Sequence, residues 1–189
     1  MVIAVDVDGV LRDFITQLQI QYKIDHPDYE PVPVTAWGLD QFFPIGRKIW
    51  NYAFYERGKE IFENAPAYFG ALEFIHNLKK LNHTVIICTT QPIYNEEYTA
   101  AWLRKNGFEY DGIFFTKYKG LLKADILLDD AVHNLCEFAE EGGDAVCMDR
   151  PWNQEWDGPR VKTYDEFLRM IDVKASGDAT EGQRGEVRI

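Results

Sequence analysis

Short apolar runs that alternate with helical patterns constrain the fold of this chain more than any other feature. The runs are rich in β-branched residues and lie at residues 2–5, 84–88, 112–115, 126–128 and 145–148. Continuous apolar runs of this length are typical of strands buried on both faces of a parallel sheet. Segments with helical spacing lie at residues 70–81, 96–106, 132–140 and 164–171. The pattern predicts an α/β fold with a doubly wound parallel sheet and right-handed crossovers.

A long segment between the first two runs has no convincing strand pattern and is dense in aromatic residues. Residues 13–24 and 45–61 have helical spacing, and a proline-rich stretch at 27–33 lies between them. We expect a small helical insertion at residues 16–66, and an α/β core formed by residues 1–15 and 67–173. From residue 174 the chain is rich in Gly, Ser and Glu, which predicts a disordered tail at 174–189.

Composition narrows the classes of partner. The chain has 189 residues, 46% of them hydrophobic, and a formal net charge of −11, so it can bury a core but has no general attraction for a nucleic-acid polymer. The odd number of cysteines, Cys88, Cys136 and Cys147, favours reduced buried thiols over a disulfide framework or a zinc site. We expect no signal peptide before the first strand and no membrane span, and therefore a cytoplasmic protein.

Polar residues follow the carboxyl ends of four apolar runs. Asp6 and Asp8 follow the first run and point to the same side of an extended chain, and Gly9 permits a tight turn after them. The other three runs are followed by Thr89 and Thr90, Lys117 and Lys119, and Asp129 and Asp130. The carboxyl ends of parallel strands share one edge of the sheet, where open α/β sheets bind their ligands. We therefore expect side chains from four distant segments to meet in one crevice.

Carboxylates, a lysine and a hydroxyl at such an edge suit a phosphate group together with a divalent cation. Two close carboxylates repel each other unless a cation or a shared proton relieves them, and Mg²⁺ prefers oxygen ligands. The metal neutralises phosphoryl oxygens, lysine adds a mobile positive charge, and one carboxylate can attack phosphorus while a second transfers the proton. Each motif alone also has a structural interpretation: a solvated turn for the first acidic pair, a helix N-cap for the second, and a strand-end turn for the threonines.

The order Asp-x-Asp, Thr, Lys and Asp-Asp resembles the haloacid dehalogenase-like phosphatases, and all four motifs of that superfamily can be placed here. Within it, the chain is most similar to the 5′(3′)-deoxyribonucleotidases, through Asp6-Val-Asp-Gly-Val-Leu11 with Phe14, Ile87-Cys-Thr-Thr90 with Pro92, and Lys119 ten residues before Asp129. The likeness covers most of residues 1–172. It implies a Mg²⁺-dependent phosphomonoesterase that forms an aspartyl-phosphate and acts on deoxyribonucleoside monophosphates, and relatives suggest a homodimer.

Carried over position by position, the resemblance implies a role for each motif residue. Asp6 is expected to be the nucleophile and a Mg²⁺ ligand. Asp8 is expected to be the general acid/base and to bind the metal through its backbone carbonyl. Asp129 and Asp130 are expected to be a metal ligand and a supporting one. The residues expected to bind the transferring phosphoryl group are Thr89, Thr90 and Lys119, with Lys117 in reserve.

The insertion corresponds in place and helical character to the cap that closes over the substrate in this family. The aromatic residues expected in the substrate pocket are Phe14, Trp37, Trp50 and Phe62, with helix packing as the alternative for each. The chain departs from animal relatives at Gln91, which precedes Pro92, and at Ala131 and Val132, where those relatives have an arginine. Both departures lie in loops near the phosphate and the base, and therefore concern the substrate preference.

Other functions stay open at this point. One is a phosphatase for another small phosphoester such as a sugar phosphate, and one is a phosphate- or metal-binding module without turnover. A response-regulator receiver domain also gathers acidic residues, Thr and Lys at the edge of a parallel sheet. In a receiver domain, however, the acidic pair comes first and the residue that accepts the phosphoryl group comes later. No helical insertion follows its first strand. The order of motifs argues against that class.

Overall fold

The structure is a computed structural model that describes residues 1–182, with side chains described for residues 1–174. Within these residues, six strands form one parallel sheet in the order β3-β2-β1-β4-β5-β6. The strands are β1 (Val2–Val5), β2 (Thr84–Thr89), β3 (Gly112–Phe115), β4 (Ile126–Asp129), β5 (Asp144–Met148) and β6 (Arg160–Val161). The predicted α/β class with a doubly wound parallel sheet is confirmed. The sequence pattern missed β6 because two residues are too few to show a strand period.

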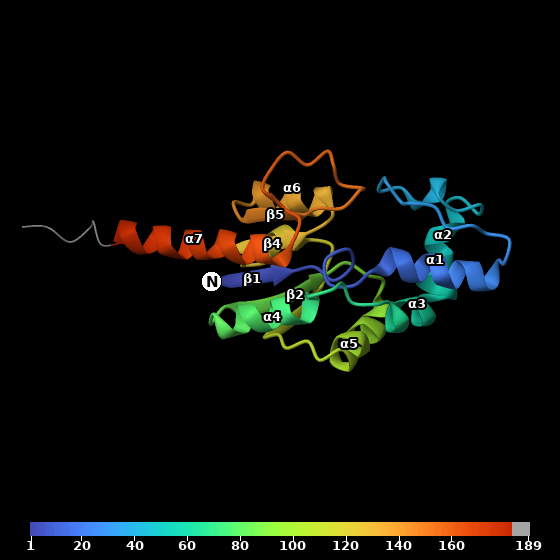
Figure 1. Ribbon diagram of the computed structural model, residues 1–189, viewed down its shortest axis with the longest axis horizontal. Coiled ribbons are helices and arrows are strands. Elements are labelled where there is room, and N and C mark those ends of the chain that lie inside the picture. Colours follow the sequence, from blue (N-terminus) through green and yellow to red (C-terminus); the bar gives the residue numbers. More distant parts are fainter. Residues whose placement is uncertain (183–189) are drawn as a thin grey trace, which may run out of the picture.

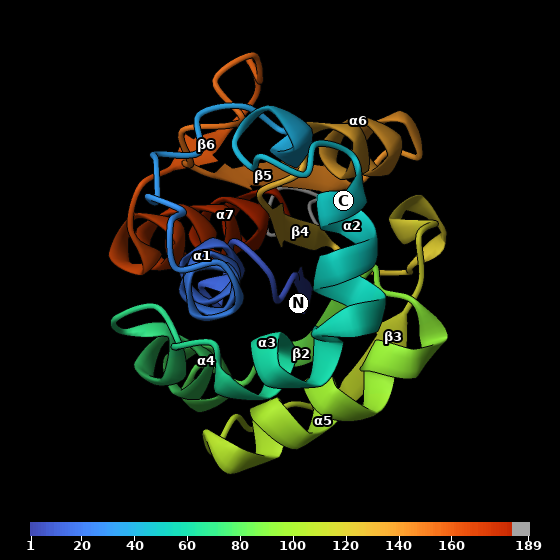
Figure 2. The same cartoon turned by 90° about the vertical axis from the view of Figure 1, so that its right-hand side faces the viewer.

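Helices cover both faces of the sheet, with α4 and α7 on one side and α6 on the other (Figure 2). Alternate residues of β1 point to opposite faces. Ile3 and Val5 pack in one apolar cluster with residues of α4 (Ala71–Lys80), α5 (Glu96–Lys105) and α7 (Tyr164–Gly182). Ala4 packs in a second cluster with residues of α6 (Val132–Glu140). The central strand is therefore buried on both faces, as its continuous apolar run predicts.

The segment between β1 and α4 contains helical elements only. These are α1 (Phe14–Asp25), the 3₁₀ turn η1 (Leu39–Gln41), α2 (Lys48–Asn51), the π-helical turn η2 (Tyr52–Glu56) and α3 (Gly58–Asn64). The single helix expected at residues 45–61 is wrong, because the backbone leaves helical geometry at Arg57, where φ is −126°. Phe14, Leu18 and Tyr22 belong to a separate apolar cluster that joins these helices. Figure 1 shows α1, α2 and α3 beyond the end of the sheet to which β1 points; the division into core and cap stays a prediction.

Two smaller expectations are wrong. α7 does not end at residue 171 but continues to Gly182; the disordered tail expected at residues 174–189 stays a prediction. Extending a helix costs much less than starting one, which lets a polar segment continue it; residues 183–189 lie outside the described part of the chain. Cys136 is exposed on α6, where its neighbours Leu135 and Phe138 supply the buried face, whereas Cys88 and Cys147 are buried free thiols. Among the described helices, none has the length and apolar character that crossing a membrane requires.

The register of the strands places their carboxyl ends side by side. Val5 of β1 lies opposite Ile87 of β2 and Leu128 of β4. The Asp6 N–H still donates to the Leu128 carbonyl at 3.0 Å, so Asp6 leaves the sheet level with the end of β4. The 3₁₀ turns η3 (Ile93–Asn95) and η4 (Lys119–Leu121) follow β2 and β3 at the same edge. Residues distant in sequence are thereby brought to one place.

Candidate active site

A buried ion-paired group lies at this edge. The Lys119 ammonium donates to Asp6 Oδ1 at 2.7 Å and to Asp129 Oδ2 at 2.6 Å. None of these three side chains is more than 8% exposed. The structure thus brings together one expected residue from each of three strand ends. Lys117, the reserve for Lys119, instead lies over the Tyr118 ring at 4.8 Å.

The second acidic pair is fixed by donors from α6 and from the loop after β5. Asp129 Oδ1 accepts the Ala131 N–H at 2.8 Å, and the Asn134 amide donates to both Asp129 oxygens at 3.2 and 3.1 Å. Asp130 Oδ2 accepts the Trp152 indole N–H at 2.8 Å. These bonds hold two buried carboxylates at defined orientations without neutralising them.

Burial and neighbouring charges shift the pKa values of three groups in this cluster. Burial raises the pKa of Asp6 to about 7, although Lys119 acts in the opposite direction. Burial also raises the pKa of Asp130, and the charges of Asp129 and Asp6 add to this effect. Burial lowers the pKa of Lys119, but the two carboxylates more than offset it, so that the pKa is raised overall.

One oxygen each of Asp6, Asp129 and Asp130 lies within 4.8 Å of the others. Three carboxylates share one ammonium, so two negative charges lack a counterion when all are ionised. Oxygen ligands and uncompensated negative charge are what Mg²⁺ requires. The donor set therefore fits the expected cofactor.

Gly9 lets the loop after β1 approach Asp130. Its φ is +78°, and a Cβ placed on it would lie 1.9 Å from Asp130 Oδ2. Any side chain at this position would therefore displace the carboxylate. The Gly9 carbonyl also accepts a hydrogen bond from Arg150 Nε at 2.6 Å, which ties this loop to the loop after β5.

The Asp8 carboxylate is held by two side chains. Arg12 donates to it through Nε at 2.7 Å and Nη2 at 3.0 Å, and Gln91 Nε2 donates to Oδ2 at 2.8 Å. The hydroxyl of Thr99 accepts from Arg12 Nη2 and donates to Gln91 Oε1, which closes the network. Gln91, at which the chain departs from its animal relatives, therefore contacts Asp8, the expected general acid/base, directly.

Arg12 explains why Phe62, one of the residues expected in the substrate pocket, does not line the cavity. Its guanidinium is fully buried between the rings of Phe62 and Trp102, with centroid distances of 4.6 and 5.1 Å. Phe62 is fully buried too and does not line the cavity. Its ring packs against a buried cation and against Phe14, which gives no support to the expected contact of Phe62 with substrate.

The two threonines differ in their surroundings. Thr89 is buried as the last residue of β2, whereas Thr90 is exposed, and both line the cavity. The Thr90 hydroxyl donates to the Thr116 carbonyl at 2.8 Å, so its proton is already used.

A cavity of about 350 Å³ opens above the acidic group. Three of the expected aromatic residues, Phe14, Trp37 and Trp50, line it together with Phe54. Phe54 stacks on Phe14 and on Trp50, with interplanar angles of 21° and 10°. Trp37 and His133, which both line the cavity, meet edge-on with centroids 5.2 Å apart. Part of the cavity wall is thus aromatic.

Sequence reasoning missed several residues at this site. Arg12 stands four residues after Asp8 and Asn134 five residues after Asp129, but neither spacing identifies a partner before the loop geometry is known. His133 has no ligand spacing and is not expected at the site, yet it lines the cavity. Trp152 lies in a loop whose aromatic character is visible in the sequence, without a sign of its contact to Asp130.

Comparisons with known proteins agree with this geometry. A hydrolase of the haloacid dehalogenase superfamily from Ehrlichia chaffeensis matches with a TM-score of 0.53 and 14% identity, over 90% of this chain and 95% of its own. A structure described as the HAD-hydrolase YfnB of Bacillus subtilis, bound to magnesium, matches with a TM-score of 0.62 and 14% identity, over 89% and 97%. These matches show that the chain shares the fold of hydrolases of the haloacid dehalogenase superfamily.

Sequence comparisons narrow the class. The chain is 24% identical over 176 residues to the 5′(3′)-deoxyribonucleotidase of Bacillus subtilis strain 168, covering 90% of this chain and 98% of the relative. The 5′(3′)-deoxyribonucleotidase of Bacillus phage SPbeta matches equally well. Residues 1–177 match the model of the family described as 5′ nucleotidase, deoxy (pyrimidine), cytosolic type C protein. The chain belongs to this family.

Proposed function

We propose that the chain is a Mg²⁺-dependent phosphomonoesterase that forms an aspartyl-phosphate on Asp6 and acts on deoxyribonucleoside 5′(3′)-monophosphates. The observation that carries the proposal is the buried contact of Lys119 with Asp6 and Asp129, at 2.7 and 2.6 Å, below an open cavity. Family membership supports hydrolysis of a nucleotide phosphomonoester. The names of the bacterial and phage relatives support a deoxyribose substrate.

Asp6, Asp129 and Asp130 would hold the Mg²⁺ ion, together with the Asp8 carbonyl. When bound, the cation supplies positive charge to the phosphoryl oxygens. The uncompensated charge of the three carboxylates supports this assignment, as does the magnesium reported for the YfnB structure.

The proposed reaction has two steps. In the first, an Asp6 oxygen bonds to phosphorus as the bond from phosphorus to the nucleoside oxygen breaks, and Asp8 gives its proton to that oxygen. In the second, Asp8 takes a proton from a water molecule that attacks phosphorus, and phosphate leaves the regenerated Asp6 carboxylate. Lys119 and Thr89 bind the transferring oxygens, and the network of Arg12 and Gln91 fixes the Asp8 side chain at the cavity.

The aromatic wall is the proposed site for the nucleobase. A cavity of about 350 Å³ falls at the lower end of the size range of small-molecule sites. Flat rings such as Phe14 and Trp50 offer a stacking surface to any base, which is a sequence-tolerant interaction. Phe14 begins α1 and Trp50 lies in α2, and Figure 1 shows both helices beyond the end of the sheet.

We further propose that residues 16–66 act as the cap over this site. Several hydrogen bonds join the end of this segment to the core; in two of them Asn95 Nδ2 donates to the Phe54 carbonyl at 3.0 Å and Trp102 Nε1 donates to the Ala65 carbonyl at 2.7 Å. The cavity is lined by residues on both sides of this boundary.

The test is phosphate release from a panel of monophosphates, with Mg²⁺ and after its removal by a chelator. The panel contains 5′- and 3′-deoxyribonucleotides, ribonucleotides and sugar phosphates. We expect Mg²⁺-dependent release that is fastest with deoxyribonucleotides. Release only from sugar phosphates would refute the substrate assignment, and no release from any compound would refute the enzymatic proposal.

A further inference from the structure

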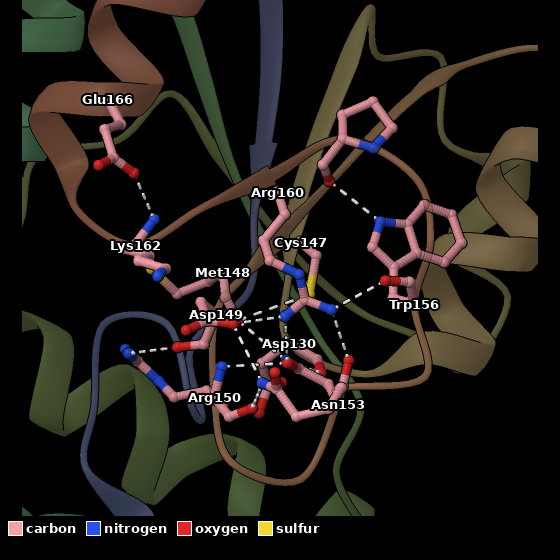
Figure 3. A network of polar contacts seen from close by, with 12 residues as sticks. Asp130, Cys147, Met148, Asp149, Arg150, Asn153, Trp156, Arg160, Lys162 and Glu166 are labelled. Carbon is pink, nitrogen blue, oxygen red and sulfur yellow. Dashed lines mark hydrogen bonds and ion pairs between the residues drawn. The ribbon is translucent and has the colours of Figure 1, made fainter.

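The loop between β5 and β6, residues 149–159, reaches from the edge of the sheet to the acidic group. Asn153 is fully buried and fixes its shape. The Asn153 side chain donates to the Met148 carbonyl at 2.9 Å, and it accepts from the Arg150 N–H at 3.0 Å and from Arg160 Nη1 at 2.9 Å. Arg160 Nη2 donates to the carbonyls of Asn153 and Trp156 at 2.8 and 2.9 Å (Figure 3). Side chains therefore cross-link this loop in one conformation.

The same loop contacts the acidic edge at three points. Asn153 Nδ2 donates to the Asp130 carbonyl at 2.8 Å, and Figure 3 shows the two residues side by side. Arg150 Nε donates to the Gly9 carbonyl. The Trp152 indole donates to Asp130 Oδ2 at 2.8 Å. Both the backbone and the carboxylate of Asp130 are thus held from one rigid support.

We propose that Trp152 is a positioning residue whose indole N–H sets the orientation in which Asp130 is presented to Mg²⁺. The inference rests on the proposed function, because it takes Asp130 as a metal ligand. The indole engages Oδ2, and Gly9 closes the space beside the same oxygen, so rotation of the carboxylate is restricted. No hydrogen bond to Asp130 Oδ1 is formed by the described residues, which leaves that oxygen for the cation. Hydrogen bonds to metal-binding carboxylates typically fix their geometry.

Trp152 has a second contact that the test must separate from this role. Its ring lines the cavity and packs against the apolar cluster of the helical insertion. Trp152→Phe keeps an aromatic ring at this place and removes only the indole N–H. Trp156→Phe is the matched control, because Trp156 lies in the same loop and its indole donates to the Pro159 carbonyl at 3.0 Å, away from the acidic group.

The experiment is calorimetric titration of Mg²⁺ into the full chain without substrate, for the wild type and both variants. We expect Trp152→Phe to weaken Mg²⁺ binding about tenfold, the low end of such effects, and Trp156→Phe to leave it unchanged. In phosphate release, the Mg²⁺ concentration for half-maximal rate rises by the same factor in Trp152→Phe.

A second measurement avoids dependence on the folding of the variant. Mg²⁺ titration of the wild type labelled with ¹⁵N-tryptophan reports the indole N–H of Trp152, identified by substituting the other tryptophans in turn. We expect this signal to shift on addition of Mg²⁺.

Three outcomes separate this inference from the proposed function. Equal Mg²⁺ affinities, or an indole signal that does not move, would overturn the role of Trp152 while an active wild type would still support the function. Weakened binding in Trp152→Phe, in a chain that hydrolyses no phosphoester, would support the role of Trp152 and refute the function. An active wild type that binds no Mg²⁺ would overturn both the positioning role and the metal dependence.

Discussion

Replacing Gly9 by alanine tests the packing of the acidic group most sharply. The residue has a φ of +78°, and a Cβ would lie 1.9 Å from Asp130 Oδ2. Ordinary contact begins at 3.4 Å, so the carboxylate must move by about 1.5 Å. The left-handed backbone costs about 1 kcal/mol for a residue with a Cβ. Loss of the Trp152 hydrogen bond to a charged group costs about 2 kcal/mol more. We therefore expect Gly9→Ala to lower the free energy of unfolding by about 3 kcal/mol.

Gly107→Ala is the matched control for this substitution. Gly107 has a φ of +76°, is exposed, and has no atom within 4 Å of the position of a Cβ. It carries the same backbone strain without the clash, so we expect a loss of about 1 kcal/mol. Phosphate release should be normal in Gly107→Ala and reduced about 100-fold in Gly9→Ala, because a misplacement on the order of 1 Å at a reacting centre has this effect.

Urea denaturation and phosphate release with a deoxyribonucleotide measure the two effects separately. Equal losses in the free energy of unfolding of the two variants would show that no group lies close enough to clash with a Cβ at position 9. A fully active Gly9→Ala would show that the position of Asp130 is unimportant for catalysis. Either result would refute the reasoning from the observed packing.

Four further substitutions test other parts of the site and its surroundings. Lys119→Met leaves Asp6 and Asp129 buried without their cation, so we expect a loss of about 3–5 kcal/mol in urea denaturation and of at least about 100-fold in phosphate release; a stable, active variant would contradict this. Thr89→Val should reduce phosphate release, whereas Thr90→Val should have little effect because its proton is bound by the Thr116 carbonyl; the reverse order would contradict the assignment. The hydrogen bond from Arg57 lowers the pKa of Asp25, although burial acts in the opposite direction. The ionised Asp25 carboxylate therefore stabilises the folded state above the ordinary aspartate pKa of about 4, and this stabilisation is lost as pH falls through the lowered pKa. Asp25→Asn should thus be less stable than the wild type by about 1 kcal/mol at neutral pH and equally stable in strong acid, and a difference that persists in acid would contradict this.

The sequence predicts this fold well because its signals are local. Each apolar run is a strand of the sheet, and the parallel arrangement alone brings Asp6, Lys119 and Asp129 to one edge. The expectations that fail depend on tertiary contacts. β6 forms only by pairing with β5, and the helix expected at residues 45–61 is interrupted at Arg57, which bonds to Asp25 on α1.

The site itself is only partly readable from the sequence for the same reason. Phe14 and Phe62 both read as aromatic residues of helical segments, yet one lines the cavity and the other is buried against Arg12. Arg12 contacts Asp8, and Trp152 contacts Asp130, only because of the conformations of the loops after β1 and β5. No spacing rule along the chain encodes those contacts, so they could not be predicted.

The proposed reaction depends above all on Asp6 as the residue that takes up the phosphoryl group. The direct measurement is rapid acid quench of the wild type with a ³²P-labelled deoxyribonucleoside monophosphate and Mg²⁺, followed by peptide mapping. We predict one labelled peptide, containing Asp6, that loses its label to hydroxylamine, and no label in Asp6→Asn. Label on another residue, or full turnover by Asp6→Asn, would contradict the account.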